Sequence, residues 1–165
     1  MHQSRAGVIL IVYSSKTPET PLFCLGKDAL SNDFTDFGGK LCKLDNGNPL
    51  KCALREFEEE SLGVFGEFGM NDVLEDYCVY SDTSLIVFIK IRVENTEWID
   101  LQFSRKLKYQ AFREIIKLKW LTLDKLNEAV NKNKIYYKPR VILKYILKED
   151  KVNLISNSTY TSITQ

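Results

Sequence analysis

The sequence lacks the residues on which several kinds of active site depend. It has one histidine in 165 residues, His2, next to the N-terminus. Chemistry built on a positioned imidazole therefore has no residue to use, which argues against Ser-His-Asp and Cys-His sites and against zinc held by histidines. No C-x-x-C pair occurs. The four cysteines lie in or beside apolar runs, and we expect buried, reduced thiols at Cys24, Cys42, Cys52 and Cys78.

Long apolar runs are also missing. The run nearest the N-terminus, 8–13, spans only six residues, and no small-residue cleavage site accompanies it. A secretory signal is therefore not expected, and no stretch approaches the length needed to cross a bilayer. We expect an intracellular, cytoplasmic protein in a reducing compartment, with no membrane partner.

The composition is that of one soluble globular domain, with 44% hydrophobic and 27% charged residues. We predict a single domain at 1–151 and a polar tail at 152–165. The net charge of +1 conceals an asymmetry, because residues 1–103 carry 9 basic and 17 acidic groups and residues 104–165 carry 14 and 5. Such a chain can hold cations in one place and phosphates in another, although solvated helix faces would give the same counts.

Residue patterns predict a mixture of strands and helices. Strands are expected at 6–15, 21–28, within 77–94 and at 117–123. One helix is expected to start at Pro49, with Asn48 as its N-cap, and to stop at Gly63. Two more helices are expected, one after the last strand and one after Pro139, and 94–113 reads as a loop. Without regular βαβ spacing, this mixture predicts an α/β fold with helices layered on a mixed central sheet.

The helix that follows Pro49 carries a cluster of carboxylates. At about 100° per residue, Glu56, Glu59 and Glu60 share one face, and a separate apolar stripe faces the sheet. Like charges at this spacing repel one another unless a cation is present, and Mg²⁺ or Mn²⁺ prefers such oxygen ligands. Arg55 can reach Glu59 at i+4 and fix its orientation. A solvated acidic face is the alternative explanation.

A glycine pair precedes this helix. Gly38 and Gly39 allow a backbone carbonyl to turn inward as a further oxygen ligand, and they allow a phosphate to approach the chain closely. Lys40 adds a positive charge beside them. From Gly39 to Val64, the sequence resembles the Nudix box of MutT-like hydrolases, G-x5-E-x7-R-E-U-x-E-E-x-G-U, in which U is a bulky apolar residue.

The R-E-U-x-E-E core of the box is intact at 55–60, and three features depart from the pattern. Asp45 stands where the family prefers Glu, nine residues instead of seven separate it from Arg55, and Leu62 is an extra residue before Gly63. We expect the longer turn to be absorbed before the helix begins. The sequence leaves open whether Asp45 contacts Arg55.

The resemblance implies a Nudix-like α/β/α sandwich and metal-dependent hydrolysis of a diphosphate linkage in a nucleoside diphosphate joined to another group. The implied ligands of Mg²⁺ or Mn²⁺ are Gly38, Glu56, Glu59 and Glu60. The implied catalytic residues include Arg55, Glu59 and Glu60. In the family, a further glutamate from a later loop often acts as ligand or base. Glu114, six residues before Trp120, is the favoured candidate, and Glu97 is its rival.

Substrate contacts are predicted at Lys40, Phe37 and Arg113. Aromatic residues could also stack on a base, although such residues more often pack in a core; the candidates are Phe23, Phe34, Phe37, Tyr80 and Phe112. The basic C-terminal section suits an extended polyanion, which makes hydrolysis of the 5′ cap of mRNA an alternative activity, and a diphosphoinositol polyphosphate a further candidate substrate.

Two alternatives to an enzyme are open. The first is a non-catalytic module with a Nudix fold that binds nucleotides or RNA, which the retained glutamates argue against. The second is a structural α/β domain with an acidic surface helix, which the glycine pair argues against. A homodimer is one assembly that the sequence leaves open.

Overall fold

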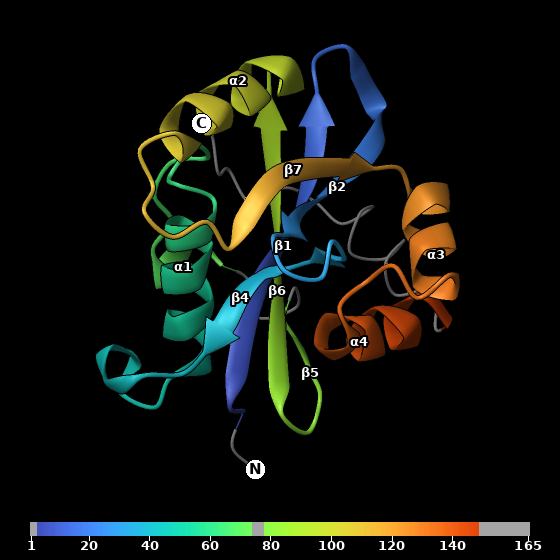
Figure 1. Ribbon diagram of the computed structural model, residues 1–165. Helices are drawn as coiled ribbons and strands as arrows, with labels where there is room; N and C mark the ends of the chain where they lie inside the picture. The colour runs from blue at the N-terminus through green and yellow to red at the C-terminus, as the bar shows by residue number, and fades with distance from the viewer. Residues whose placement is uncertain (1–2, 74–77, 149–165) are drawn as a thin grey trace.

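The computed structural model describes residues 3–73 and 78–148, which form a mixed sheet between layers of helices (Figure 1). Within these residues, seven strands pair in the order β3-β2-β1-β6-β5, with β4 joined to β1 and β7 joined to β2. Their bounds are β1 (Arg5–Ser14), β2 (Thr17–Asp28), β3 (Phe34–Thr35), β4 (Phe37–Lys40), β5 (Cys78–Tyr80), β6 (Ser84–Val93) and β7 (Ile115–Leu121).

The centre of the sheet is a parallel pair. β1 and β6 run side by side with Arg5 opposite Ser84 and Ser14 opposite Val93. The other strand pairs are antiparallel. Because helices cover both faces of β1 and β6, these strands are nearly continuous runs of apolar, largely β-branched residues and show only partial alternation.

Four α-helices cover the two faces of the sheet within the described residues: α1 (Pro49–Glu60), α2 (Thr96–Leu107), α3 (Leu123–Asn131) and α4 (Tyr137–Lys148). Val8 of β1 belongs to the same core cluster as Phe57 of α1 and Phe103 of α2. The next residue, Ile9, points the other way and belongs to a second cluster with Leu143 of α4. Figure 1 shows α1 on one side of the sheet, and α3 and α4 on the other. The predicted α/β sandwich with a mixed sheet is therefore confirmed.

The start of α1 follows the predicted signals. The Asn48 side chain accepts hydrogen bonds from the backbone N–H groups of Leu50 (3.0 Å) and Lys51 (3.3 Å), and Pro49 is the first helical residue. The helix ends at Glu60, earlier than predicted, because Leu62 and Gly63 both adopt left-handed backbone angles, with φ of 56° and 68°. The left-handed backbone after the helix thus begins at Leu62, one residue before the predicted stop at Gly63.

The predicted loop at 94–113 is wrong over most of its length. Thr96–Leu107 forms α2, and Asn95 caps it by accepting hydrogen bonds from the N–H groups of Glu97 (2.9 Å) and Trp98 (3.4 Å). Only Ile99 and Phe103 of this helix are buried. So narrow an apolar face leaves a weak helical period in the sequence.

The thiols are less uniformly buried than predicted. Cys24 and Cys52 are buried, and Cys78 is partly buried. Cys42 is exposed because it precedes the short 3₁₀ helix η1 (Lys43–Asp45) at the surface.

The predicted tail at 152–165 lies outside the described residues, as do the last residues of the predicted domain, 149–151. Within 3–73 and 78–148, no helix has both the length and the apolar character needed to cross a membrane.

Candidate active site

Three carboxylates meet beside the glycine pair. Glu56 and Glu60 lie one turn apart on α1, and Glu114 immediately precedes β7. One oxygen atom of each lies within 4.8 Å of the corresponding atoms of the other two. Glu56 and Glu60 are partly buried, whereas Glu114 is exposed. Two segments that are far apart in the sequence thus bring their acidic groups to one point.

Of these three glutamates, Glu60 occupies the position least favourable for a negative charge. Its Oε1 atom is buried and has no hydrogen-bond partner among the described residues. Burial, reinforced by the carboxylates of Asp36, Glu114 and Glu56, raises the pKa of Glu60 to about 10. Burial also raises the pKa of Glu56, although Arg55 opposes this shift. A desolvated oxygen among other carboxylates suits a hard cation that would neutralise them.

Arg55 is held by Asp45. The guanidinium donates from Nε to Oδ1 at 2.8 Å and from Nη2 to Oδ2 at 2.9 Å, and Asp45 is fully buried. Asp45 also accepts a hydrogen bond from the backbone N–H of Cys42 at 2.8 Å. These bonds hold the pKa of Asp45 well below its usual range and raise that of Arg55. The long turn therefore still brings an acidic residue to the helix arginine, helped by left-handed angles at Asn46 and Gly47.

The remaining donors of Arg55 point at neighbouring groups of the site. Nη1 lies 3.2 Å from Glu56 Oε1 and 3.2 Å from Glu59 Oε2, which confirms the predicted i+4 contact. Nη2 donates to the backbone carbonyl of Lys40 at 3.3 Å. The Glu59 side chain is 57% exposed and lies outside the group formed by the three clustered glutamates. Arg55 thus ties α1 to the end of β4 and turns Glu59 towards solvent.

The glycine pair makes room for carboxylates. Gly38 and Gly39 of β4 lie opposite Gly7 and Ala6 of β1. A Cβ atom on Gly39 would overlap the carboxylate of Glu56, and one on Gly38 would lie 2.8 Å from Asp36 Oδ2. Side chains at these two positions would therefore displace the acidic groups.

Asp36 and Arg5 form a buried pair under the site, which the sequence did not reveal. Arg5 donates to Asp36 from Nη1 at 2.8 Å and from Nη2 at 2.6 Å, and Asp36 is fully buried. The Oγ1 of Thr35 donates to Asp36 at 3.0 Å. Gly7 and Gly38 face each other across β1 and β4, and both leave space for the Asp36 carboxylate. Gly7 and Gly38 are the sequence signal that could have indicated this buried pair.

A cavity of about 470 Å³ adjoins the carboxylates. Its acidic wall includes Glu60 and Glu114, and its basic lining consists of Arg5, Lys40, Arg113 and Lys138. Gly38 and Gly39 also line it. Because the two signs of charge meet in one cavity, it can accept a cation at one end and phosphate groups at the other.

The predicted substrate contacts divide between cavity and core. Lys40 and Arg113 line the cavity. Phe37 is fully buried, with its ring centroid 5.6 Å from that of Phe57 in an edge-to-face contact. The stacking role predicted for Phe37 does not fit this position, because its ring packs in the core.

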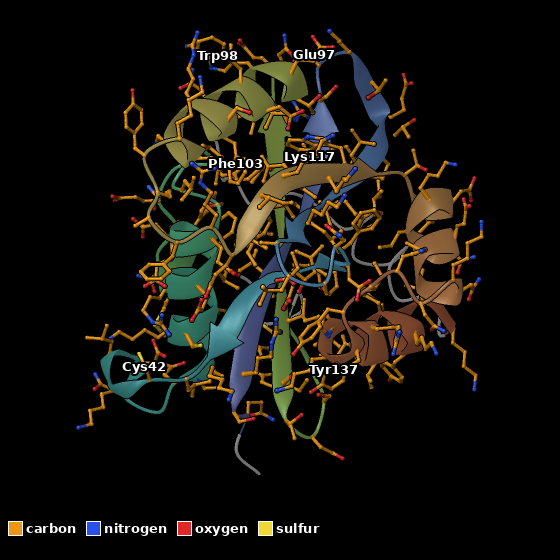
Figure 2. The ribbon with its side chains drawn as sticks, in the orientation of Figure 1. Cys42, Glu97, Trp98, Phe103, Lys117 and Tyr137 are labelled. Atoms are coloured by element: carbon orange, nitrogen blue, oxygen red, sulfur yellow. The ribbon has the colours of Figure 1, made fainter. Side chains whose placement is uncertain are left out.

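Glu97, the rival of Glu114, lies elsewhere. It is in the first turn of α2, with its side chain 79% exposed and 3.6 Å from Lys16 Nζ. Figure 2 shows Glu97 at the end of the molecule that carries α2. Of the two glutamates, the structure brings Glu114 to the carboxylates of α1.

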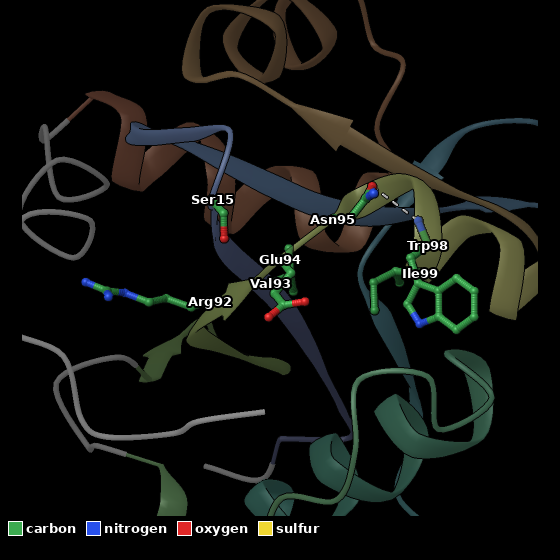
Figure 3. A pocket seen from close by; sticks show the side chains of 7 residues that line it. All are labelled: Ser15, Arg92, Val93, Glu94, Asn95, Trp98 and Ile99. Atoms are coloured by element: carbon green, nitrogen blue, oxygen red, sulfur yellow. Dashed lines mark hydrogen bonds between the residues drawn. The ribbon is translucent and has the colours of Figure 1, made fainter.

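A larger cavity of about 700 Å³ lies at the ends of β1 and β6 and the start of α2 (Figure 3). Its lining consists of Ser15, Arg92, Val93, Glu94, Asn95, Trp98 and Ile99. This lining includes a single carboxylate and shares no residue with the cavity beside Glu60. Size alone therefore does not identify the functional site, and the acidic cluster selects the smaller cavity.

Comparison with known proteins places the fold. No family model and no curated protein matches the sequence. A crystal structure of an Ap4A hydrolase from C. elegans, in a binary complex, matches with a TM-score of 0.53 over 87% of this chain and 96% of that chain, at 15% identity. The chain therefore has the α/β fold of that structure.

Two further solved structures match less closely. A second structure of C. elegans Ap4A hydrolase has a TM-score of 0.46 and 16% identity over 87% of this chain and 95% of that chain. The NUDIX domain of Shewanella oneidensis NrtR, complexed with ADP ribose, has a TM-score of 0.46 and 12% identity over 78% of this chain and 77% of that chain.

Proposed function

We propose that this chain is a metal-dependent pyrophosphohydrolase that cleaves a diphosphate linkage in a nucleoside diphosphate joined to another group. The observation that carries the proposal is the meeting of Glu56, Glu60 and Glu114 at the edge of a cavity with a basic lining. The R-E-U-x-E-E motif at 55–60 and the fold shared with the C. elegans Ap4A hydrolase support it.

The donor set fits Mg²⁺ or Mn²⁺. Glu56, Glu60 and Glu114 offer only carboxylate oxygens, which hard divalent cations prefer, and Glu60 Oε1 has no partner among the described residues. The carbonyl of Gly38 and the carboxylate of Glu59 are proposed as additional ligands. A divalent cation bound here would neutralise phosphate charge and make a water molecule at the site more acidic.

The other residues would bind and orient the reactants. Lys40 and Arg113, both on the cavity wall, are proposed to contact the phosphates. Arg55, fixed by Asp45, would keep Glu56 and Glu59 in place. In the proposed reaction, water attacks one phosphorus and its proton passes to the exposed carboxylate of Glu114. The bridging P–O bond breaks, and the other phosphate leaves with the bridging oxygen and the electron pair.

A panel of substrates with Mg²⁺ or Mn²⁺ tests the proposal. It should contain nucleoside triphosphates, dinucleoside polyphosphates, sugar nucleotides, capped RNA and diphosphoinositol phosphates. On the best substrate, Glu60→Gln, Glu56→Gln and Glu114→Gln should each lower kcat by about a hundredfold or more, with an unchanged circular dichroism spectrum. Glu58→Gln, on the exposed side of α1, is the matched control and should keep full activity. Full activity in Glu60→Gln would contradict the proposal.

Hydrolysis of the 5′ cap of RNA is the second candidate. Lys138, at the start of α4, lines the cavity, and Lys144 and Lys148 continue a basic series along that helix. If RNA follows this helix, affinity for a capped oligonucleotide should fall steeply with salt, whereas hydrolysis of a free dinucleotide should change little. Equal salt slopes for the two substrates would count against RNA.

Two further possibilities can be tested on the same purified protein. One is a binding module without activity, and the other is an assembly of two copies. The module predicts nucleotide binding with no turnover on any member of the panel. A homodimer predicts twice the monomer mass of 19.1 kDa in solution.

A further inference from the structure

The five aromatic residues that the sequence offered for base stacking are not equally available. Phe23 and Phe37 are fully buried. Phe34 packs against the core under α3 and α4, with Lys119 Nζ 5.4 Å from its ring centroid. Tyr80 lies on β5, and the lining of the cavity beside Glu60 does not include it. Phe112 is the member of this set that lines that cavity, and it is 89% exposed.

A second apolar side chain lies on the same rim. Leu30 is 96% exposed and lines the cavity together with Phe112. The pairing of β2 with β7 brings the two segments together, since Asp28 is opposite Ile115 and the Ala29 N–H donates to the Glu114 carbonyl at 2.8 Å. Single exposed apolar residues are common on protein surfaces, but two on one rim of a charged cavity favour a ligand with an apolar face.

The turn that carries Leu30 is well ordered by hydrogen bonds. The Oδ2 of Asp28 accepts from the N–H of Leu30 at 3.2 Å, from the N–H of Ser31 at 2.8 Å and from the Ser31 hydroxyl at 2.9 Å. Asn32 adopts a left-handed φ of 61°, which closes the turn. Leu30 is therefore presented to solvent by a defined backbone, so a ligand that lies on it would not have to order this loop.

Tyr136, the other aromatic residue in the cavity lining, already has partners. The ring of Tyr136 lies 4.9 Å from that of Tyr137, centroid to centroid, and the Arg5 guanidinium lies 5.7 Å from its centroid. Phe112 and Leu30 remain as the exposed apolar surface of the rim. Arg113 and Glu114 follow Phe112 directly, so this surface adjoins both the basic lining and the acidic cluster.

We propose that Phe112 and Leu30 form the platform on which the nucleobase of the substrate stacks, with its phosphates directed towards Arg113 and the acidic cluster. The assignment of the phosphate end rests on the proposed function, and the base end rests on the two exposed side chains. Stacking on an aromatic side chain tolerates different bases. The platform therefore favours nucleotides over base-free phosphates without selecting one base.

Direct binding tests the platform without the need for turnover. With Mg²⁺ present, calorimetric titration of ADP and of inorganic pyrophosphate is carried out on the wild type, Phe112→Ala, Phe112→Trp, Leu30→Ala and Tyr109→Ala. Phe112→Ala should weaken ADP binding by about tenfold to a hundredfold and leave pyrophosphate binding unchanged. Phe112→Trp should restore ADP binding, and Leu30→Ala should weaken it to a smaller extent.

Tyr109→Ala is the matched control, because Tyr109 is 88% exposed in the same connection and does not line the cavity. It should leave both affinities unchanged. The platform is overturned if Phe112→Ala changes both affinities equally or neither, or if the wild type does not bind ADP. If the wild type hydrolyses no substrate but Phe112→Ala selectively weakens ADP binding, the hydrolase proposal fails and the platform stands.

Discussion

Asp36 and Glu60 are neighbouring acidic groups, close enough for the carboxylate of Asp36 to raise the pKa of Glu60, and they differ in their partners. Asp36 is fully buried and receives two hydrogen bonds from Arg5. Glu60 has a buried oxygen without a partner among the described residues, and burial together with the carboxylates of Asp36, Glu114 and Glu56 raises its pKa. Removal of one partner from a buried pair destabilises the native state, whereas a carboxylate crowded by other carboxylates costs stability until a cation binds.

Asp45, like Asp36, is a buried carboxylate paired with an arginine. Its bidentate contact with Arg55 is satisfied within the protein, and that arginine then holds Glu56 and Glu59. The carboxylates paired with an arginine, Asp36 and Asp45, therefore have a structural role. The crowded carboxylates, such as Glu60, are the groups available to a ligand. Four variants test this division, taken from the largest expected effect to the smallest.

Arg5→Met should have the largest effect on stability. It leaves Asp36 buried without its cation, and breaking one side of a buried pair costs about 3–5 kcal/mol. The free energy of unfolding from urea denaturation measures this loss. A decrease below about 1 kcal/mol would show that Asp36 does not depend on Arg5, since that is the range of exposed pairs.

Asp45→Asn should cost less, about 1.5–3 kcal/mol at pH 7, because it replaces charged hydrogen bonds to Arg55 by neutral ones. The pKa of Asp45 is lowered from its ordinary value of 3.8, so its contribution is present above that pH and is lost as the pH falls further. The difference in unfolding free energy between wild type and variant should therefore be full at pH 7 and shrink near pH 3. An equal difference at both pH values would exclude a charged pair.

Glu59→Gln should change stability by only about 0.3–0.5 kcal/mol, because Glu59 is 57% exposed and its contact with Arg55 is an i+4 pair within one helix. Thermal or urea unfolding checks this value. A loss comparable to that of Asp45→Asn would assign Glu59 a structural role like that of Asp45 and would contradict its proposed role as a metal ligand.

Lys16→Met should have the smallest effect and is the control for removal of a cation. Lys16 and Glu97 are 65% and 79% exposed and 3.6 Å apart, so the pair is screened by water and salt. We expect a change within about 0.5 kcal/mol in the same urea experiment. A loss like that of Arg5→Met would show that unfolding responds to net charge and not to burial of the pair.

Sequence patterns predicted the local elements of the site better than its long-range contacts. The cap at Asn48, the face shared by Glu56 and Glu60, and the contact of Arg55 with Glu59 follow from helix geometry. The sheet was predictable because β1 and β6 are nearly continuous apolar runs. Such runs are typical of strands that helices cover on both faces.

Contacts between distant segments could not be read in this way. The Arg5–Asp36 pair joins residues 31 apart, and it depends on the register of β1 against β4. The position of Phe37 in the core and of Phe112 on the rim depends on which side of the fold each ring faces. The helix α2 was missed because only two of its residues are buried.

The stability of Glu60→Gln with and without Mg²⁺ tests the central claim most directly. Without metal at pH 7, the variant should be at least as stable as the wild type, because Glu60, with its pKa raised to about 10, must take up a proton on folding, whereas the amide needs none. At about 100 times its dissociation constant, Mg²⁺ should stabilise the wild type by about 2.7 kcal/mol and the variant much less, so that the order of stabilities reverses. A variant that is less stable without metal, or that gains as much from Mg²⁺ as the wild type, would contradict the account.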